Sequence, residues 1–367
     1  MQTPLATLVA VGFLVGQLHG QEPTSDQEDP NLVDSILGQL ESMESSAEYG
    51  SKSSFIGIHG FFDLEYKNGD NQGSTFDLHH ANLLFDIALA QDTDVRLEFE
   101  WEHGGDTVEV DQAFLDFHPF EQPLSMIFGR FYAPFGRERF NWYPPASVTA
   151  SRPFAMREIV PGNWYETGLM LKWVDEEEDP SWIIETAASN GLGDDLDVGV
   201  RSARQTRNNN GNVMLSGRVG YMHEAAEAGV SFANGKYDDN GSDAFQYLGV
   251  DFTTKLWDCE LTGEWVSSSV DEASAPGGEF ERHGWYLLAY YPILDENHDV
   301  GVFGRFDRID PDDRVRDADD RSAATIGIRW APTERITFKF EYQNINHLAN
   351  GSWPEEDLFF FQAVLDF

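Results

Sequence analysis

The sequence predicts an all-β fold, a transmembrane antiparallel β-barrel of about 16 strands, on the basis of three observations. After Gly50, apolar and polar residues alternate with a period of two up to the end of the chain. The alternating runs approach the roughly 9–11 residues that a tilted strand needs to cross a bilayer, which is longer than most strands of soluble proteins. Short turns and long loops also alternate along the chain, as they do in bacterial outer-membrane barrels.

The alternation separates an apolar face from a charged face. In the segment 335–343, Phe338 and Phe340 fall on one side of the strand, and Lys339 and Glu341 on the other. Because a membrane-spanning sheet has one side in lipid, we expect the apolar set to face lipid and the charged set to face a wet lumen. The same pattern assigns Leu97, Phe99, Leu169 and Leu171 to the lipid face, and Arg96, Glu98, Glu100 and Arg335 to the lumen.

An even strand number is predicted from the count of alternating runs. Sixteen strands would enclose an aqueous channel, whereas weak alternation near Ile184 and Val230 leaves 14 as the alternative. The runs centre near Phe61, Phe85, Leu97, Leu115, Phe128, Leu169, Ile184, Leu215, Val230, Val250, Leu261, Leu287, Val302, Ile326, Phe338 and Phe361. Their ends carry candidate girdle aromatics at Tyr66, Trp101, Trp164, Tyr165, Trp173, Tyr221, Trp265, Trp285, Tyr291, Trp330 and Tyr342.

The connections are predicted to fall on two different rims. Short ones occur at 91–94, 119–123 and 331–334, and longer ones at 133–163, 190–211, 271–281, 310–321 and 345–356. The last run ends the chain on Phe367, which resembles the carboxy-terminal assembly signal of outer-membrane barrels.

Three regions are predicted along the chain. Residues 1–20 are typical of a signal peptide because they hold an apolar stretch from Leu5 to Val15, although a buried strand or helix is the alternative. Residues 21–50 carry eight acidic residues and no Lys or Arg, which predicts a mostly disordered periplasmic segment with room for one short helix. Residues 51–367 form the predicted barrel.

Composition argues against several other classes of protein. The formal net charge of −40 would repel nucleic acid, and the single Cys259 excludes a disulfide scaffold. His79 and His80 look like a metal-binding pair, but neighbouring side chains of a regular strand face opposite sides, so one ion could not take both. We therefore expect no enzyme activity, no metal and no cofactor.

The order of segments resembles the phosphate-selective porin O and P family. Four stretches of sequence carry the resemblance: the strand pair 60–64 and 81–85, the segment 112–117 that leads to 128–136, the segment 283–290, and the segment 304–310. It implies a sixteen-stranded, usually trimeric outer-membrane porin, and hence a homotrimer in contact with outer-membrane lipid. The family's phosphate specificity depends on an arginine ladder and a lysine cluster, of which this chain shows no excess.

The resemblance also implies a constriction built by the third outer loop, which is expected after the fifth strand at 133–163. This loop has a net charge of +2. Its arginines either form a basic ring or pair with wall carboxylates such as Glu98, Glu100, Glu166 and Glu264 and thereby fasten the loop. The candidate constriction residues are Arg130, Arg137, Glu138, Arg139, Arg152, Arg157 and Glu158. The candidate lumen wall comprises Arg96, Glu98, Glu100, Glu166, Lys172, Arg218, Glu264, Arg305, Arg329, Lys339 and Glu341.

The function predicted from these observations is passive diffusion of small hydrophilic solutes or ions across the bacterial outer membrane. Acidic walls and mouths predict a mild cation preference, provided that the loop arginines are paired. Two alternatives stay open: an anion- or phosphate-selective porin that uses the basic third loop, and a structural or adhesion barrel with a closed pore.

Overall fold

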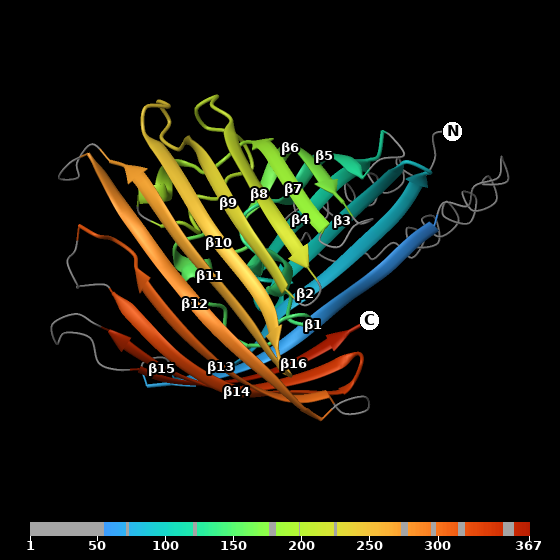
Figure 1. Cartoon of the computed structure of the whole chain (residues 1–367), viewed down its shortest axis with the longest axis vertical. Helices are drawn as coiled ribbons and strands as arrows, with labels where there is room; N and C mark the ends of the chain where they lie inside the picture. Colours follow the sequence, from blue (N-terminus) through green and yellow to red (C-terminus); the bar gives the residue numbers. More distant parts are fainter. Residues whose placement is uncertain are drawn as a thin grey trace, which may run out of the picture. The chain divides into compact units, whose positions relative to one another are not determined.

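The computed structural model forms a closed antiparallel barrel (Figure 1). It describes residues 55–70, 73–119, 123–175, 181–197, 199–223, 226–272, 278–294, 299–314, 320–347 and 356–367. The predicted signal peptide and acidic segment lie outside these residues and stay predictions. The strands are β1 Phe55–Gly69, β2 Gly73–Ala90, β3 Thr93–Glu102, β4 Thr107–Phe117, β5 Leu124–Tyr132, β6 Tyr165–Val174, β7 Ser181–Ser189, β8 Met214–His223, β9 Ala226–Lys236, β10 Ala244–Leu256, β11 Cys259–Asp271, β12 Glu279–Leu294, β13 Asp299–Asp310, β14 Arg321–Thr333, β15 Ile336–His347 and β16 Glu356–Asp366.

Each strand pairs with its neighbours in sequence, and β1 closes the ring against β16. At the seam, the Gly60 N–H donates to the Phe367 carbonyl oxygen at 3.0 Å, and the Phe367 N–H donates back at 2.9 Å. All sixteen predicted run centres lie within strands, so the prediction of 16 strands is confirmed and the alternative of 14 is wrong. Closure gives every strand a hydrogen-bonded neighbour on both sides, which is the condition for a sheet to span lipid.

The two rims differ as predicted. Turns such as 91–92 and 334–335 are short, whereas 133–164 and 190–213 connect strands through long segments on the other rim. The short helices α3 (Glu138–Asn141) and α4 (Ala155–Glu158) lie in the first of these long segments, and the 3-10 helix η2 (Asp194–Asp197) lies in the second. The 3-10 helix η1 (His103–Gly105) lies in the short connection 103–106 between β3 and β4. Within the described ranges, no helix has the length and apolarity that a membrane crossing requires.

The outer face of the barrel is apolar and the inner face is polar. Leu169, Leu171 and Phe340 are exposed, whereas Glu98 and Lys339 on the opposite face are buried. Three assignments were wrong. Trp164 and Tyr165 lie buried inside the barrel because the third loop ends there, and Arg335 lies exposed in the turn before β15.

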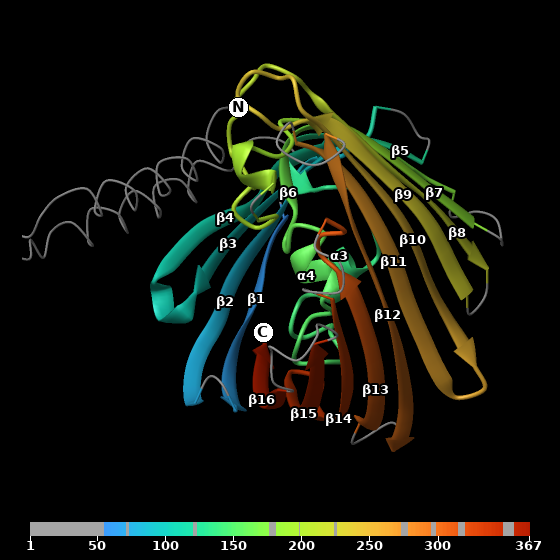
Figure 2. The same ribbon diagram turned by 90° about the vertical axis from the view of Figure 1, so that its left-hand side faces the viewer.

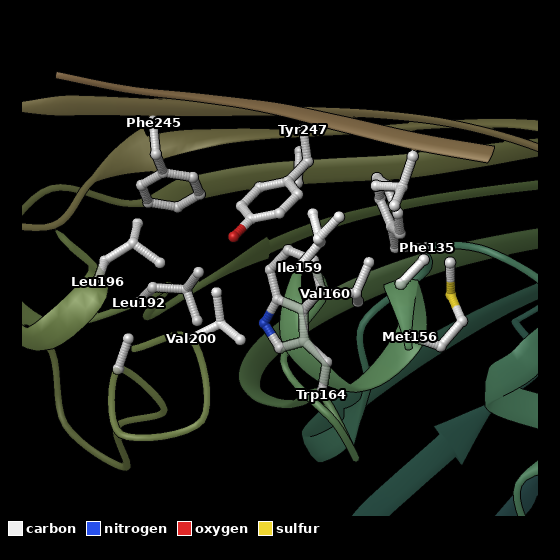
Figure 3. Packing of buried hydrophobic residues seen from close by; sticks show 14 of the residues in the cluster. Phe135, Met156, Ile159, Val160, Trp164, Leu192, Leu196, Val200, Phe245 and Tyr247 are labelled. Atoms are coloured by element: carbon white, nitrogen blue, oxygen red, sulfur yellow. The ribbon is translucent and has the colours of Figure 1, made fainter. Parts of the chain in front are cut away.

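The loop segment that carries α3 and α4 lies inside the barrel (Figure 2), and the main hydrophobic core packs around it (Figure 3). Phe135, Ile159 and Trp164 from the third loop pack with Leu192 and Leu196 from the fourth. These side chains meet buried residues of the wall between β8 and β15, namely Met214, Ala233, Phe245, Tyr247, Val266, Val270, Phe280, Tyr286, Ile309, Ala323 and Ile345. One side of the lumen is therefore filled, and open space is displaced toward the other side.

The two faces of β6 provide a test of the orientation. Leu169→Arg places a charge in lipid near the middle of the strand and should cost roughly 2–4 kcal/mol of unfolding free energy. Lys172→Gln on the lumen face should change it by less than about 0.5 kcal/mol. Urea titration of the barrel in lipid vesicles measures both values. Equal costs for the two variants would show that the faces have been assigned wrongly.

Candidate functional site

The third outer loop, residues 133–164, folds into the barrel instead of standing on its rim, with α3 and α4 inside the lumen (Figure 2). Two cavities meet at this loop. The outer cavity measures about 330 Å³ and is lined by loop residues that include Trp142 and Pro144. The inner cavity measures about 800 Å³ and is lined by Tyr143, Pro145 and Ala146. The short stretch 142–146 thus lies between the two cavities and forms the candidate constriction.

Glu341 of β15 holds the middle of the loop. Its carboxylate accepts hydrogen bonds from the Ala150 N–H at 2.9 Å and the Ser151 N–H at 3.2 Å, and also from the Ser151 hydroxyl. Arg305 of β13 donates to the Ser151 carbonyl at 2.6 Å, and Lys339 donates to the Pro144 carbonyl at 2.8 Å. Hydrogen bonds to ionised groups are among the strongest in proteins, so these wall residues fix the loop in place.

Glu264 of β11 holds the beginning of the loop. It accepts the Arg137 N–H at 3.0 Å and the Tyr286 hydroxyl at 2.9 Å. Gly136 precedes this contact with a φ of +67°, and a Cβ there would lie 2.6 Å from a Glu264 oxygen. A glycine is therefore needed both for the backbone conformation and for the close approach of the carboxylate.

Glu98 and Glu166 fasten the remaining parts of the loop. Glu98 of β3 accepts the Tyr143 hydroxyl at 2.6 Å. Glu166 of β6 accepts the Trp164 indole N–H at 2.7 Å and the Gly191 N–H at 2.9 Å, which also ties in the fourth loop. Three of the four glutamates named as partners therefore do hold the loop, but through its backbone, a phenol and an indole instead of its arginines.

The loop arginines are paired, but with other carboxylates than those predicted. Arg137 pairs with Glu227 of β9, and Arg139 pairs with Glu185 of β7. Within the loop, Arg152 forms a bidentate pair with Glu138 at 2.9 and 2.6 Å. Arg157 donates to Glu158 at 2.8 Å, and Arg321 of β14 pairs with the same carboxylate.

Other predicted wall residues take up different positions. Arg218 is fully buried and donates to Asp251 at 2.5 Å and to Glu227 at 2.8 Å, next to Arg137. Arg96 and Lys172 line the inner cavity, and Arg329 pairs with Asp299. Glu100 is buried and near Asp111. Of the predicted constriction residues, Arg130, Arg137 and Glu158 line neither cavity, and Arg130 stacks over the Tyr165 ring at 5.5 Å.

The outer cavity is richer in cationic side chains than the net charge of the chain suggests. Six Lys or Arg residues line it, against three Glu residues and three histidines. Sequence reasoning missed Arg201 and Arg204, because they come from the fourth loop and no spacing in the sequence links that loop to the third. The cationic set is Lys67, Arg152, Arg157, Arg201, Arg204 and Arg305, and the acidic set is Glu65, Glu102 and Glu138.

Glu158 in α4 is ionised at neutral pH. Burial opposes its ionisation, but the guanidinium groups of Arg157 and Arg321 outweigh burial and hold the pKa of the carboxyl below its usual value. One carboxylate thus faces two cations, so this group carries a net positive charge.

Comparison with known proteins identifies the barrel. The profile of the phosphate-selective porin O and P family matches residues 56–357, which is most of the chain. The chain belongs to this family. An uncharacterized protein of Aquifex aeolicus (strain VF5) is 24% identical to this porin over 332 residues, covering 78% of the porin and 75% of that protein.

Solved structures share the fold of the porin at low sequence identity. An anion-selective porin from Comamonas acidovorans superposes with a TM-score of 0.63 at 11% identity, covering 86% of this chain and 100% of that one. Salmonella typhi OmpF in complex with daunomycin gives 0.59 at 12% identity, and the trimer form of Vibrio cholerae OmpT gives 0.57 at 11%, with the same coverage. These likenesses show the barrel fold, and the family match identifies the chain as an outer-membrane porin.

Removal of the Glu341 carboxylate should loosen the loop. Glu341→Ala leaves the Ala150 and Ser151 N–H groups and the Ser151 hydroxyl without their buried acceptor, and each such loss costs about 1–3 kcal/mol. Glu260→Ala, on an exposed residue of the wall, is the matched control. Single-channel recording should show a larger and noisier conductance for Glu341→Ala alone. Wild-type conductance in that variant would contradict the role given to Glu341.

The stabilisation by Glu158 should depend on pH. Because its folded-state pKa is lowered, the contribution is complete above the unfolded pKa of about 4.3 and is lost as the pH falls further. Glu158→Gln should therefore destabilise the porin by about 1 kcal/mol at pH 7, after allowance for solvent screening, and by much less at pH 3. Urea unfolding at both pH values measures this difference. An equal cost at both would refute the ion-pair explanation.

Proposed function

We propose that this porin lets small hydrophilic solutes diffuse passively across the outer membrane, with a weak preference for anions. The observation that carries the proposal is the lining of the outer cavity, in which cationic side chains outnumber acidic ones by two to one. Charges at a narrow, wet passage select ions by attracting one sign and raising the barrier to the other.

Charges of both signs lie next to one another in the outer cavity. Lys67 pairs with Glu65 on β1 at 2.6 Å, and Arg201 of the fourth loop pairs with Glu102 of β3 at 3.2 Å. A solute in this cavity therefore meets closely spaced positive and negative groups. Such a lining favours ions and strongly dipolar solutes over apolar ones, because only charged and polar groups gain energy from it.

The inner cavity weakens the preference for anions. Three cationic residues line it against five acidic ones, so its local charge has the opposite sign. Its cationic residues are Arg96, Arg139 and Lys172, and its acidic residues are Asp86, Asp94, Asp116, Glu185 and Asp366. An ion that passes both cavities meets nearly balanced totals, which supports weak selectivity.

The proposal replaces the cation preference expected from net charge alone. The pairing of Arg137 and Arg139 supports that expectation, but Arg204, together with Arg201, which pairs with Glu102 at 3.2 Å, adds cations that it did not include. Acidic groups on the outer rim act over a Debye length of about 8–10 Å in salt, so they influence the passage less than charges that line it. The family description and the anion-selective structural neighbour are consistent with an anion preference.

We further propose a homotrimer, supported by a structural neighbour described in a trimer form. Chemical cross-linking in the membrane, followed by mass determination, tests this assembly. A structural barrel with a closed pore remains the second candidate, and a folded protein without any conductance would favour it.

Reversal potentials in a potassium chloride gradient test the selectivity. The wild-type porin should give a small reversal potential whose sign shows that chloride permeates more readily than potassium. Arg201→Gln with Arg204→Gln should shift it toward cations, because two of the six cationic groups of the outer cavity are lost. Arg308→Gln, on an exposed side chain of β13 that lines neither cavity, is the control. A strongly cation-selective wild-type pore would contradict the proposal.

A further inference from the structure

His79 and His80 of β2 both line the outer cavity, although regular strand alternation would place them on opposite faces. The register explains why. Asp63 pairs with His80 and Leu64 with Leu78, so His79 is an extra residue in a β-bulge. The two imidazole rings lie side by side with centroids 3.8 Å apart. The argument from alternation against a shared ion was therefore wrong for this pair.

Carboxylates of β1 lie next to both rings. His80 Nδ1 is 2.9 Å from Asp63 Oδ1, and His79 Nδ1 is 4.0 Å from Asp63 Oδ2. In a tetrahedral zinc site with bonds of about 2.0–2.1 Å, neighbouring ligand atoms are about 3.3 Å apart. The observed separations lie on both sides of this value, so small rotations of the side chains would bring all three groups to one ion.

The surrounding residues leave Asp63 as the carboxylate ligand. Glu65 is near His79, at 3.1 Å, but its other oxygen holds the Lys67 ammonium at 2.6 Å. Asp63 is fully buried, and Gln362 donates to its Oδ2 at 2.9 Å. Hydrogen bonds from such a second layer of residues orient metal ligands.

Two further groups of potential ligands share these histidines. His79 is within 4.8 Å of Asp77 and His103, and His80 is within 4.8 Å of Glu100 and Glu102, measured between potential ligand atoms. Glu100 is 2% exposed, and its Oε1 has no hydrogen-bond partner among the described residues. A buried oxygen of this kind is costly unless it meets a donor or a cation.

We propose that the outer cavity carries a site for a divalent transition-metal ion of the zinc type, bound by His79, His80 and Asp63. Two imidazoles and one carboxylate suit zinc, whereas magnesium and calcium prefer sites built from oxygen alone. Three protein ligands leave a fourth position open toward the cavity for water. The bound ion adds positive charge beside the passage and narrows the passage. Zinc binding should therefore lower the conductance of the pore. This inference is independent of the proposed anion preference.

The test is a zinc titration of the folded, chelator-treated porin by isothermal calorimetry. One zinc ion per chain should bind to the wild type, and His79→Asn with His80→Asn should weaken binding at least about tenfold. His283→Asn is the matched control, because the described residues place one carboxylate in ion-pair distance of His283, that of Asp310 at 3.4 Å. A shift in electrophoretic mobility between unheated and heated samples confirms that each variant has folded. If the double variant does not fold, the single variant His79→Asn replaces it.

A second measurement uses the same variants. Zinc added to the side of the long loops should reduce single-channel conductance in the wild type and in His283→Asn, but not in the histidine double variant. The proposal is overturned if the wild type binds no zinc, if the double variant binds it equally well, or if magnesium binds as tightly as zinc. Loss of binding in His283→Asn would also overturn it, since it would assign the zinc to the surface.

Discussion

The architecture of the pore depends on buried carboxylates of the barrel wall that accept hydrogen bonds from the inserted loop. Glu98, Glu264 and Glu341 are each 5% exposed or less, and each accepts hydrogen bonds from loop residues. A charged group removed from water is costly without such partners, and backbone N–H groups are equally costly when left unpaired. Wall and loop therefore stabilise each other.

This mutual dependence makes the lumen asymmetric. Polar anchors hold the loop along its length, while Phe135, Ile159 and Trp164 pack it against the half of the wall formed by β8 to β15. Both cavities then lie mainly along β1 to β7 and β16. The apolar core inside the barrel thus determines which part of the lumen stays open to water. The fourth loop shares that core and brings Arg201 and Arg204 to the passage.

Alternation was sufficient to predict the strands because every strand of this barrel separates lipid from water. It predicted all sixteen strands and the inward direction of Glu98 and Lys339. It could not reveal the bulge at His79. One extra residue turns both histidines toward the lumen but leaves the alternation of the residues before and after them unchanged. The partners of Arg137 and Arg139 were also out of reach, since Glu227 and Glu185 lie far away in sequence and many glutamates face the lumen.

The central claim is that the stretch 142–146 between the two cavities sets the size of the pore. Replacement of these residues by two glycines, with the anchors at Glu264 and Glu341 kept, tests the claim most directly. Single-channel conductance and the size limit for neutral sugars in liposome swelling should both rise several-fold, while the barrel stays folded. If both values stay at the wild-type level, the narrowest point lies elsewhere and the role given to the inserted loop is wrong.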